Sequence, residues 1–352
     1  MTFKRLIAAL LLVVFVIGAI ACNKVEESDE SPDPSEAEDT ATEELTEKKT
    51  EKKTEKKTQK VTEKETRPIK ATEPPTMLED LDGLDLNLKV LTQNVRYADD
   101  PNGNSVKERT TRFGALLDEY KPDLVGTQEV TFEWYNYLSS LENYALIGSS
   151  KTGKEGEAGD WNVIMYNVDR FVVMDSDTFW LTDTPDRVSQ VKNASGVRIC
   201  TWAELYDRYT GETIIMANTH IDHKNTDVRV QQLNYLFKHL RKRLFERYED
   251  CRIYLTGDFN CAVNSRPYMI ATTSKFVDSR AVTLEDNSKG KVSFHGYNGQ
   301  EYMFDYCFFK GDDTVLSYEI ITKNYIGEMD TEPGFVSDHY GVISVFERKA
   351  AK

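Results

Sequence analysis

The chain has 352 residues, a formal net charge of −15 at pH 7 and 39% hydrophobic residues. Its length allows one large domain or two ordinary ones. The excess of acidic residues argues against a protein that binds nucleic acid through a non-specific basic surface. Bound cations or a local arginine cluster can offset the negative potential at a site. Five irregularly spaced cysteines indicate neither a disulfide framework nor a CxxC metal site.

The first residues of the chain have the pattern of an export signal. Lys4 and Arg5 precede an apolar run over 6–21, which is short for a membrane span and typical of a signal-peptide core. The run ends in Ala-Ile-Ala-Cys, which resembles a bacterial lipoprotein cleavage box in which the cysteine is lipidated. We therefore predict a signal peptide at 1–22 and a lipid anchor on Cys22, with an uncleaved single-pass anchor as the alternative. Both predict a domain tethered at the extracellular face of the cell membrane.

Residues 23–76 have a composition typical of a linker. The segment is rich in Glu, Lys, Thr, Ser and Pro, repeats a TEKK unit and contains no Phe, Tyr or Trp, so it cannot bury a core. Like charges stand four residues apart, as at Glu51 and Glu55, which disfavours a lasting helix. We predict a disordered, solvated stalk.

Residues 77–352 have the pattern of one folded α/β domain. Six short, mostly apolar segments are predicted as strands: 88–95, 123–130, 162–168, 213–220, 252–260 and 304–310. Ser105 and Glu108 form the pattern of a capping box at the start of a helix that Pro122 ends. A second helix is predicted at 227–248. Strands and helices interleaved in this way indicate layered α/β packing.

Polar side chains stand where these predicted strands end, at positions that a buried strand does not need for packing. An isolated Asn or Asp after a strand is usually a turn former, but this many in one domain favour a shared site at one edge of the sheets. The residues concerned are Asn94, Glu129, His220, Asp258, Asn260, Asp305, Asp338 and His339.

Their chemistry suits hydrolysis of a phosphate ester. Mg²⁺ prefers oxygen ligands and needs only one or two carboxylates, which Glu129 and Asp338 can supply with the help of Asn94. A protonated imidazole, an amide and a metal ion stabilise the charge that grows on a phosphate in the transition state. His339 beside Asp305 has the arrangement of an oriented base for the attacking water.

The chain resembles the endonuclease/exonuclease/phosphatase superfamily through six motifs, which occur in the same order as in the family. They are TQNVRY, GTQEV, NTHIDH, TGDFN, MFDYCFF and SDHYGV, spread over about 86–346. The resemblance implies a four-layered α/β/β/α sandwich with two mixed β-sheets, as in DNase I. The segments TFWLTDTPD, RICTW and SFHGY are similar to those of a bacterial branch of the superfamily.

The resemblance also implies a role for each motif residue. Glu129 is expected to be the main Mg²⁺ ligand, with Asn94 beside it and Asp338 completing the site; Mn²⁺ is an alternative ion. His220 and Asn260 are expected to contact the scissile phosphate.

The proton-transfer roles follow from the same resemblance. Asp258 is expected to orient the attacking water or the leaving oxygen, and Asp305 to hold His339. Whether His339 or Asp258 takes the water's proton stays open in the resemblance, and we favour His339 because a carboxylate partner keeps an imidazole basic.

Three further residues are candidates for substrate binding. Arg198 and Arg229 are expected to contact phosphate; the alternative for each is a surface salt bridge without a role in substrate binding. His223 is expected at the edge of the site, with a structural role as the equal alternative.

These observations together predict an extracellular, metal-dependent phosphoric ester hydrolase, most readily a monomeric phosphodiesterase acting on nucleic acid or phospholipid headgroups. The first alternative is a phosphomonoesterase for inositol phosphates or phosphoinositides. Two alternatives belong to other classes: a non-catalytic surface-binding module, and a zinc hydrolase built on His220, Asp222 and His223. The zinc pattern requires a histidine where Asn218 stands, and zinc prefers several nitrogen or sulfur ligands.

Overall fold

The computed structural model describes residues 75–153, 160–245 and 247–350. The predicted signal peptide with Cys22 and nearly all of the predicted stalk therefore lie outside the described residues. Among the helices of the described part, none combines the length and the apolar character that crossing a membrane requires.

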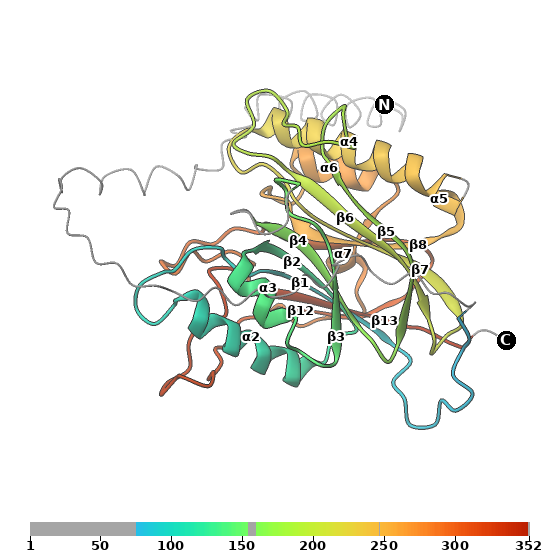
Figure 1. Cartoon of the computed structure of the whole chain (residues 1–352), viewed down its shortest axis with the longest axis horizontal. Coiled ribbons are helices and arrows are strands. Elements are labelled where there is room, and N and C mark those ends of the chain that lie inside the picture. The colour runs from blue at the N-terminus through green and yellow to red at the C-terminus, as the bar shows by residue number, and fades with distance from the viewer. Residues whose placement is uncertain (1–74, 154–159, 246, 351–352) are drawn as a thin grey trace, which may run out of the picture. The chain divides into compact units, whose positions relative to one another are not determined.

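The described residues form two mixed β-sheets that pack face to face (Figure 1). In spatial order the first sheet contains β10 (Glu285–Asp286), β12 (Val315–Ile321), β13 (Gly341–Phe346), β1 (Leu88–Asn94), β2 (Leu124–Val130), β4 (Trp161–Asn167) and β3 (Tyr144–Ile147). The second contains β5 (Phe171–Trp180), β6 (Ile199–Asp207), β7 (Glu212–His220), β8 (Arg252–Asp258), β11 (Asp305–Lys310) and β9 (Val277–Asp278). The pairs β1–β2 and β7–β8 are parallel, and most other pairs are antiparallel.

Helices cover the outer face of each sheet (Figure 1). They are α2 (Val106–Tyr120) and α3 (Phe132–Leu138) on the first sheet, and α4 (Thr226–Leu244), α5 (Arg247–Asp250) and α6 (Arg266–Thr273) on the second, with the short α7 (Ser279–Val282) near the sheet edge. This arrangement confirms the predicted four-layered α/β/β/α sandwich.

The helix boundaries follow from local chemistry. Ser105 and Glu108 form the predicted capping box at the start of α2, and Lys121, in a left-handed conformation with φ of 47°, ends the helix before Pro122. The second predicted helix is shorter than expected, because Phe245 turns the backbone to a φ of 43° and ends α4.

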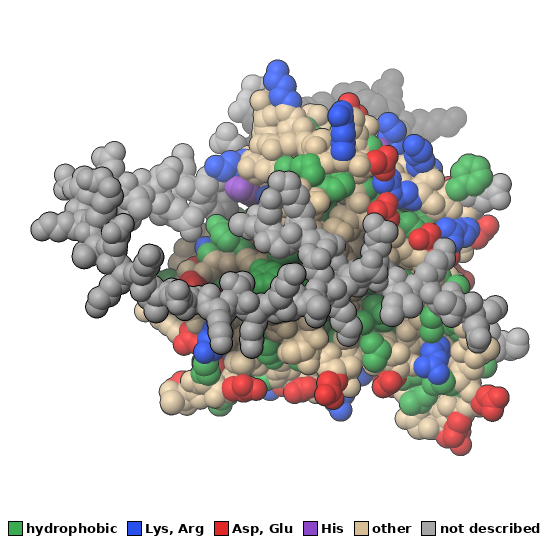
Figure 2. All heavy atoms as spheres, in the orientation of Figure 1, with side chains coloured by type: hydrophobic (Ala, Val, Ile, Leu, Met, Phe, Trp, Pro, Cys, Tyr) green, Lys and Arg blue, Asp and Glu red, His purple; other side chains and the backbone are tan. Residues whose placement is uncertain are grey.

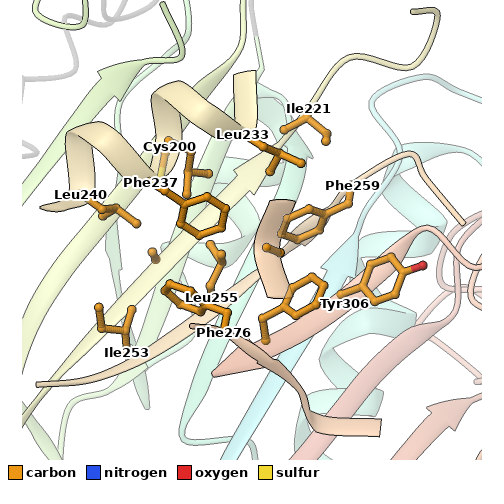
Figure 3. Packing of buried hydrophobic residues seen from close by; sticks show 14 of the residues in the cluster. Cys200, Ile221, Leu233, Phe237, Leu240, Ile253, Leu255, Phe259, Phe276 and Tyr306 are labelled. Carbon is orange, nitrogen blue, oxygen red and sulfur yellow. The ribbon is translucent and has the colours of Figure 1, made fainter. Parts of the chain in front are cut away.

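Three hydrophobic clusters hold the layers together. One lies between the sheets and joins residues such as Val90 and Met216. A second packs α2 and α3 on the first sheet. The third packs α4 and α6 on the second sheet, where Phe237 and Phe276 lie with ring centroids 5.1 Å apart (Figure 3). Strand ends held between two such cores are fixed in position, which is what a site at a sheet edge needs.

Candidate active site

The sheets bring the predicted site residues to one edge of the sandwich. Asn94 and Glu129 lie at the carboxyl ends of the parallel strands β1 and β2. His220 and Asp258 end the parallel strands β7 and β8, and the two residues are register partners. Asp305 is the partner of Asp258 on the other side.

Asp305 differs from the sequence expectation in one respect. It begins β11 rather than ending a strand, and Asp338 and His339 likewise precede β13. Because β11 and β13 run antiparallel to β8 and β1, their first residues reach the same edge as the last residues of the other strands. Strand direction depends on the fold as a whole and is invisible in a local sequence pattern.

A backbone irregularity aims Glu129 into the site. The register between β2 and β4 shifts between Thr127 and Val130, and Glu129 within this bulge has a φ of 62°. Bulges beside functional sites redirect a side chain, and a residue other than glycine keeps a left-handed conformation only where its surroundings enforce it. The Glu129 carboxylate accepts the backbone N–H of Tyr97 at 3.0 Å.

Asn94 connects the two sheets. Its amide nitrogen donates to Glu129 Oε1 and to Asp258 Oδ2, both at 3.1 Å. Its amide oxygen accepts the backbone N–H of Arg96 at 3.0 Å. In this orientation, assigned from the hydrogen bonds, Asn94 presents its nitrogen to the carboxylates and orients Glu129; its role as a metal ligand stays a prediction.

His339 is bound to Asp305 as the sequence predicts. Its Nδ1–H donates to Asp305 Oδ2 at 2.8 Å, and its Nε2 lies 3.8 Å from Asp258 Oδ2. Burial lowers the pKa of His339, but the charge and hydrogen bond of Asp305, helped by Asp258 and Asp338, outweigh burial and raise it to about 10. Asp305 therefore favours the protonated form of His339.

Asp258 has the opposite character. Burial and the neighbouring charge of Asp305 raise its pKa to about 7, against the lowering effect of His339. A carboxylate with a pKa near neutrality is well matched to accept a proton from water. His339 as the base stays a prediction from the sequence, and the raised pKa of Asp258 makes this carboxylate a second candidate for that role.

His220 and Asn260 lie beside this pair. The amide nitrogen of Asn260 donates to His220 Nε2 at 3.1 Å, and His220 Nε2 is 3.6 Å from Asp258 Oδ2. Burial, followed by the positive charges of Arg198 and Lys151, lowers the pKa of His220 well below its ordinary value. His220 is therefore neutral.

The residues on the acidic side of the site fit a divalent cation. Burial is the main cause that raises the pKa of Glu129, and the charge of Asp338 is the next. These two carboxylates repel each other and are little exposed. Their oxygens are of the kind that Mg²⁺ or Mn²⁺ accepts, and the Arg96 guanidinium lies 3.7 Å from Asp338.

A second group of possible ligands consists of Asp258, Asp305 and His339, whose ligand atoms lie within 4.8 Å of one another. In the described residues, His339 Nδ1 already donates to Asp305. This bond orients the imidazole and helps to raise its pKa, and we interpret the trio as the proton-handling part of the site.

The candidate substrate-binding residues have different surroundings. Arg198 lines a small pocket with His220, Lys151 and Asp160, and its buried Nε has no hydrogen-bond partner among the described residues. Its guanidinium lies 3.2 Å from His223 Nδ1.

Arg229 instead supports the turn before α4. Its guanidinium donates to the carbonyl oxygens of His223 at 2.9 Å and Asp222 at 3.4 Å and to Thr226 Oγ1 at 2.8 Å. Asp222 accepts the backbone N–H groups of Lys224 and Asn225, also within this turn. A carboxylate used in this way is not presented to a zinc ion, and Asn218 is buried within the sheets.

Sequence reasoning missed Arg109, a fully buried residue of α2. Its guanidinium donates to the carbonyl oxygens of Val95, Arg96, Ala98 and Asn104. It thereby fixes the loop after β1, which supplies backbone N–H groups to Asn94 and Glu129. A charged residue on the apolar face of a predicted helix was the available signal.

The fold and the site together define a phosphate-ester hydrolase built on two mixed sheets. The sequence model of the endonuclease/exonuclease/phosphatase family matches residues 91–339. The chain therefore belongs to this family, whose members hydrolyse phosphate esters.

Solved structures with the same fold include two from Bacteroides. A mannosyl-6-phosphatase of Bacteroides thetaiotaomicron is 24% identical with a TM-score of 0.67, over 74% of this chain and 99% of that one. A family protein of Bacteroides vulgatus is 28% identical with a TM-score of 0.66, over 75% and 100% of the two chains. TDP2 of D. rerio, complexed with a single-stranded DNA product, is 18% identical with a TM-score of 0.57, over 75% and 100%. No curated protein sequence matches the chain.

Proposed function

We propose that this protein is a magnesium-dependent hydrolase of phosphate esters that acts outside the cell, with phosphodiesters as the first substrate class. One observation carries the proposal: two mutually repelling carboxylates, Glu129 and Asp338, share one sheet edge with Asp258 and the His339–Asp305 pair. Metal-dependent phosphoester hydrolysis needs this combination of hard oxygen ligands and proton-handling groups.

Glu129 and Asp338 would hold the ion, Mg²⁺ or alternatively Mn²⁺. When bound, the ion supplies positive charge that stabilises the phosphate oxygens in the transition state. Asn94 keeps the Glu129 carboxylate in place through its amide nitrogen.

The remaining residues transfer protons and contact the phosphate. Asp258, with its pKa raised to about 7, accepts a proton from the attacking water. His339, with its pKa raised to about 10, donates its Nε2–H to a phosphate oxygen and stabilises the growing charge. Asn260 and the neutral His220 contact the same phosphate, and Asp305 keeps the imidazolium oriented.

The test uses the purified full-length protein with bis-p-nitrophenyl phosphate, in buffer with Mg²⁺, with Mn²⁺ or with EDTA. We expect turnover with either ion and none with EDTA. A His339→Ala variant is the control for contaminating hydrolases. A well-folded protein without turnover on any phosphate ester, with either ion, would support the alternative of a non-catalytic surface-binding module.

Phosphomonoesters are a second candidate, and one observation favours them. Lys151, which is paired with Asp160, and Arg198 lie with His220 in one small pocket, and the Arg198 Nε is buried with no hydrogen-bond partner in the described parts of the chain. A terminal phosphate carries a second negative charge that such cations can neutralise. The ratio of kcat/KM for p-nitrophenyl phosphate to that for the bis ester distinguishes the two classes, and an Arg198→Gln variant should lower this ratio.

Export and lipidation of Cys22 remain part of the proposal. Their support is the charged start, the apolar run over 6–21 and the cysteine that follows it. In a bacterial host, labelled palmitate should enter the wild-type protein and not a Cys22→Ser variant. A variant that keeps the label would contradict lipidation at this residue.

A further inference from the structure

A cleft of about 500 Å³ opens on the acidic side of the site. It lies between the loop after β1, the first turns of α2, Tyr297 and the loop 329–335 that leads to Asp338. Its volume is typical of small-molecule binding sites, which hold roughly 300–1,000 Å³. The pockets beside His220 and behind His339 hold about 10 Å³ each, too little for an organic group.

The cleft is joined to the reaction centre through the segment that carries Tyr297. The backbone N–H groups of His295 and Gly296 donate to the carbonyl oxygen of Asp338 at 3.0 and 3.1 Å. Burial is the main cause that raises the pKa of Tyr297, and the charges of Arg109 and Asp338 also act on it. The segment of Tyr297 therefore connects the cleft lining to Asp338, one of the cation ligands that we propose.

Tyr297 has two unusual features. Its hydroxyl oxygen is buried and has no hydrogen-bond partner in the described chain, which is uncommon for a buried polar atom. Its backbone has a φ of 55°, a strained conformation of the kind kept at ligand-binding sites. Because Tyr297 lines the cleft, a hydroxyl group of a bound molecule would provide the missing partner once the side chains that cover this oxygen move aside.

The charge of the cleft selects against anions. Arg112 is the one basic side chain among the described residues that line it, and both of its hydrogen bonds to Asp330 measure 2.6 Å. Glu108 and Glu332 add negative charge to the lining. On the face of the molecule that Figure 2 shows, acidic side chains lie along the α2 side and basic side chains gather over α4. A nucleic-acid strand, whose phosphates continue beyond the reacting one, is repelled here.

The remaining lining is polar with two aromatic rings. Asn102, Asn324 and Thr331 offer amide and hydroxyl groups, and Tyr297 and Phe335 offer ring faces. A sugar has hydroxyl groups around its edge and C–H groups on its faces, so it matches both. An acyl chain matches neither the carboxylates nor the amides.

We propose that this cleft binds the alcohol part of the substrate and that this part is an uncharged, hydroxyl-rich group such as a sugar or polyol. The inference rests on the proposed phosphoester hydrolase function and names its substrate class. Tyr297 is the specificity residue, since its hydroxyl bonds to the alcohol rather than to the phosphate.

The test compares three competitive inhibitors of p-nitrophenyl ester hydrolysis by the Mg²⁺-loaded full-length protein. A hexose 6-phosphate and ethyl phosphate carry the same charge and differ in their hydroxyl groups, and the dinucleotide pTpT carries an extra phosphate. We expect the hexose 6-phosphate to bind about tenfold more tightly than ethyl phosphate, the gain of one or two hydrogen bonds. Tyr297→Phe should reduce that ratio to about twofold or less.

Two matched variants test whether the charge of the cleft selects against anions. Glu332→Lys, in the cleft lining, should tighten pTpT binding several-fold, whereas Glu328→Lys, which is exposed outside the lining, should leave all three constants unchanged. Equal binding of hexose 6-phosphate and ethyl phosphate to the wild-type protein overturns the inference. Loss of reporter hydrolysis itself is a separate result that overturns the proposed function.

Discussion

The two sheets contribute chemically different halves to the site. The first sheet supplies Glu129 and Asp338 beside Asn94, the half suited to a cation. The second supplies His220, Asp258 and Asp305, the half suited to a phosphate and to proton transfer, and His339 reaches over from the first sheet to complete it.

This division of the site explains why the fold suits such chemistry. The two halves use different side chains, although buried hydrogen bonds of Asn218 to Gln128 and to the carbonyl oxygens of Thr127 and Val163 join the sheets behind the site. Asn94 donates to a carboxylate of each half at 3.1 Å, and His339 joins Asp305 at 2.8 Å. We therefore expect the metal requirement and the chemical step to respond separately to mutation.

The largest expected effect is that of removing the imidazole. His339→Ala should lower kcat by at least about a hundredfold, since proton-donating side chains contribute roughly 10²–10⁴ in rate. The Mg²⁺ concentration for half-maximal activity should change little, because His339 belongs to the proton half. Circular dichroism and thermal unfolding check that the variant folds. Wild-type turnover in this variant would remove His339 from the mechanism.

The pH dependence of kcat/KM tests which residue is the base. Activity should rise as Asp258 loses its proton near pH 7 and fall as His339 loses its proton near pH 10. An Asp258→Asn variant should lose most activity and with it the acidic limb. If activity instead rises up to pH 10, neutral His339 is the base and the two roles are exchanged.

Glu129→Gln should act on the half of the site that is suited to a cation. The amide keeps the size of the carboxylate but removes the charge, so the Mg²⁺ concentration for half-maximal activity should rise by about tenfold or more. At saturating Mg²⁺ a large part of kcat should return. Activity in EDTA, or a shift of equal size in His339→Ala, would contradict the separation of the halves.

Arg109→Lys should have a smaller effect on the Mg²⁺ concentration that half-maximal activity requires. Lysine cannot bridge the four carbonyl oxygens that the guanidinium joins, so the loop after β1 loses part of its support. We expect a several-fold rise in the Mg²⁺ requirement and about 2–4 kcal/mol less stability in urea unfolding. Lys107→Met, on the exposed face of the same helix, is the control. A loss of stability with an unchanged Mg²⁺ requirement would limit Arg109 to a structural role.

Much of the site could be predicted from the sequence because its residues interrupt apolar segments. Asn94, His220 and Asp258 stand at the ends of segments that had to be buried strands, and the structure brings them together. Other features depend on the fold as a whole. The direction of β11, which places Asp305 at a strand start, and the position of Tyr297 beside Asp338 follow from pairings between distant segments.

The smallest expected effect is that of His295→Gln, and it concerns only the pH dependence of stability. Burial lowers its pKa to about 4, helped by the charge of His339 and opposed by that of Asp338. As a neutral ring it donates from Nε2 to the carbonyl oxygen of Ser337 at 3.1 Å and accepts the backbone N–H of Tyr297 at 3.3 Å.

The sign of the pH effect follows from this shift. Below an unfolded pKa of about 6.5, the unfolded chain binds a proton that the folded chain refuses, so stability falls as pH drops from about 6.5 to 4. Between pH 7.5 and 5 the wild type should lose about 1–2 kcal/mol more than His295→Gln, which has no proton to bind. Equal losses in urea unfolding would show that His295 is protonated in the folded state. Its ring would then no longer accept the Tyr297 N–H, and the link between the cleft and Asp338 would weaken in acid.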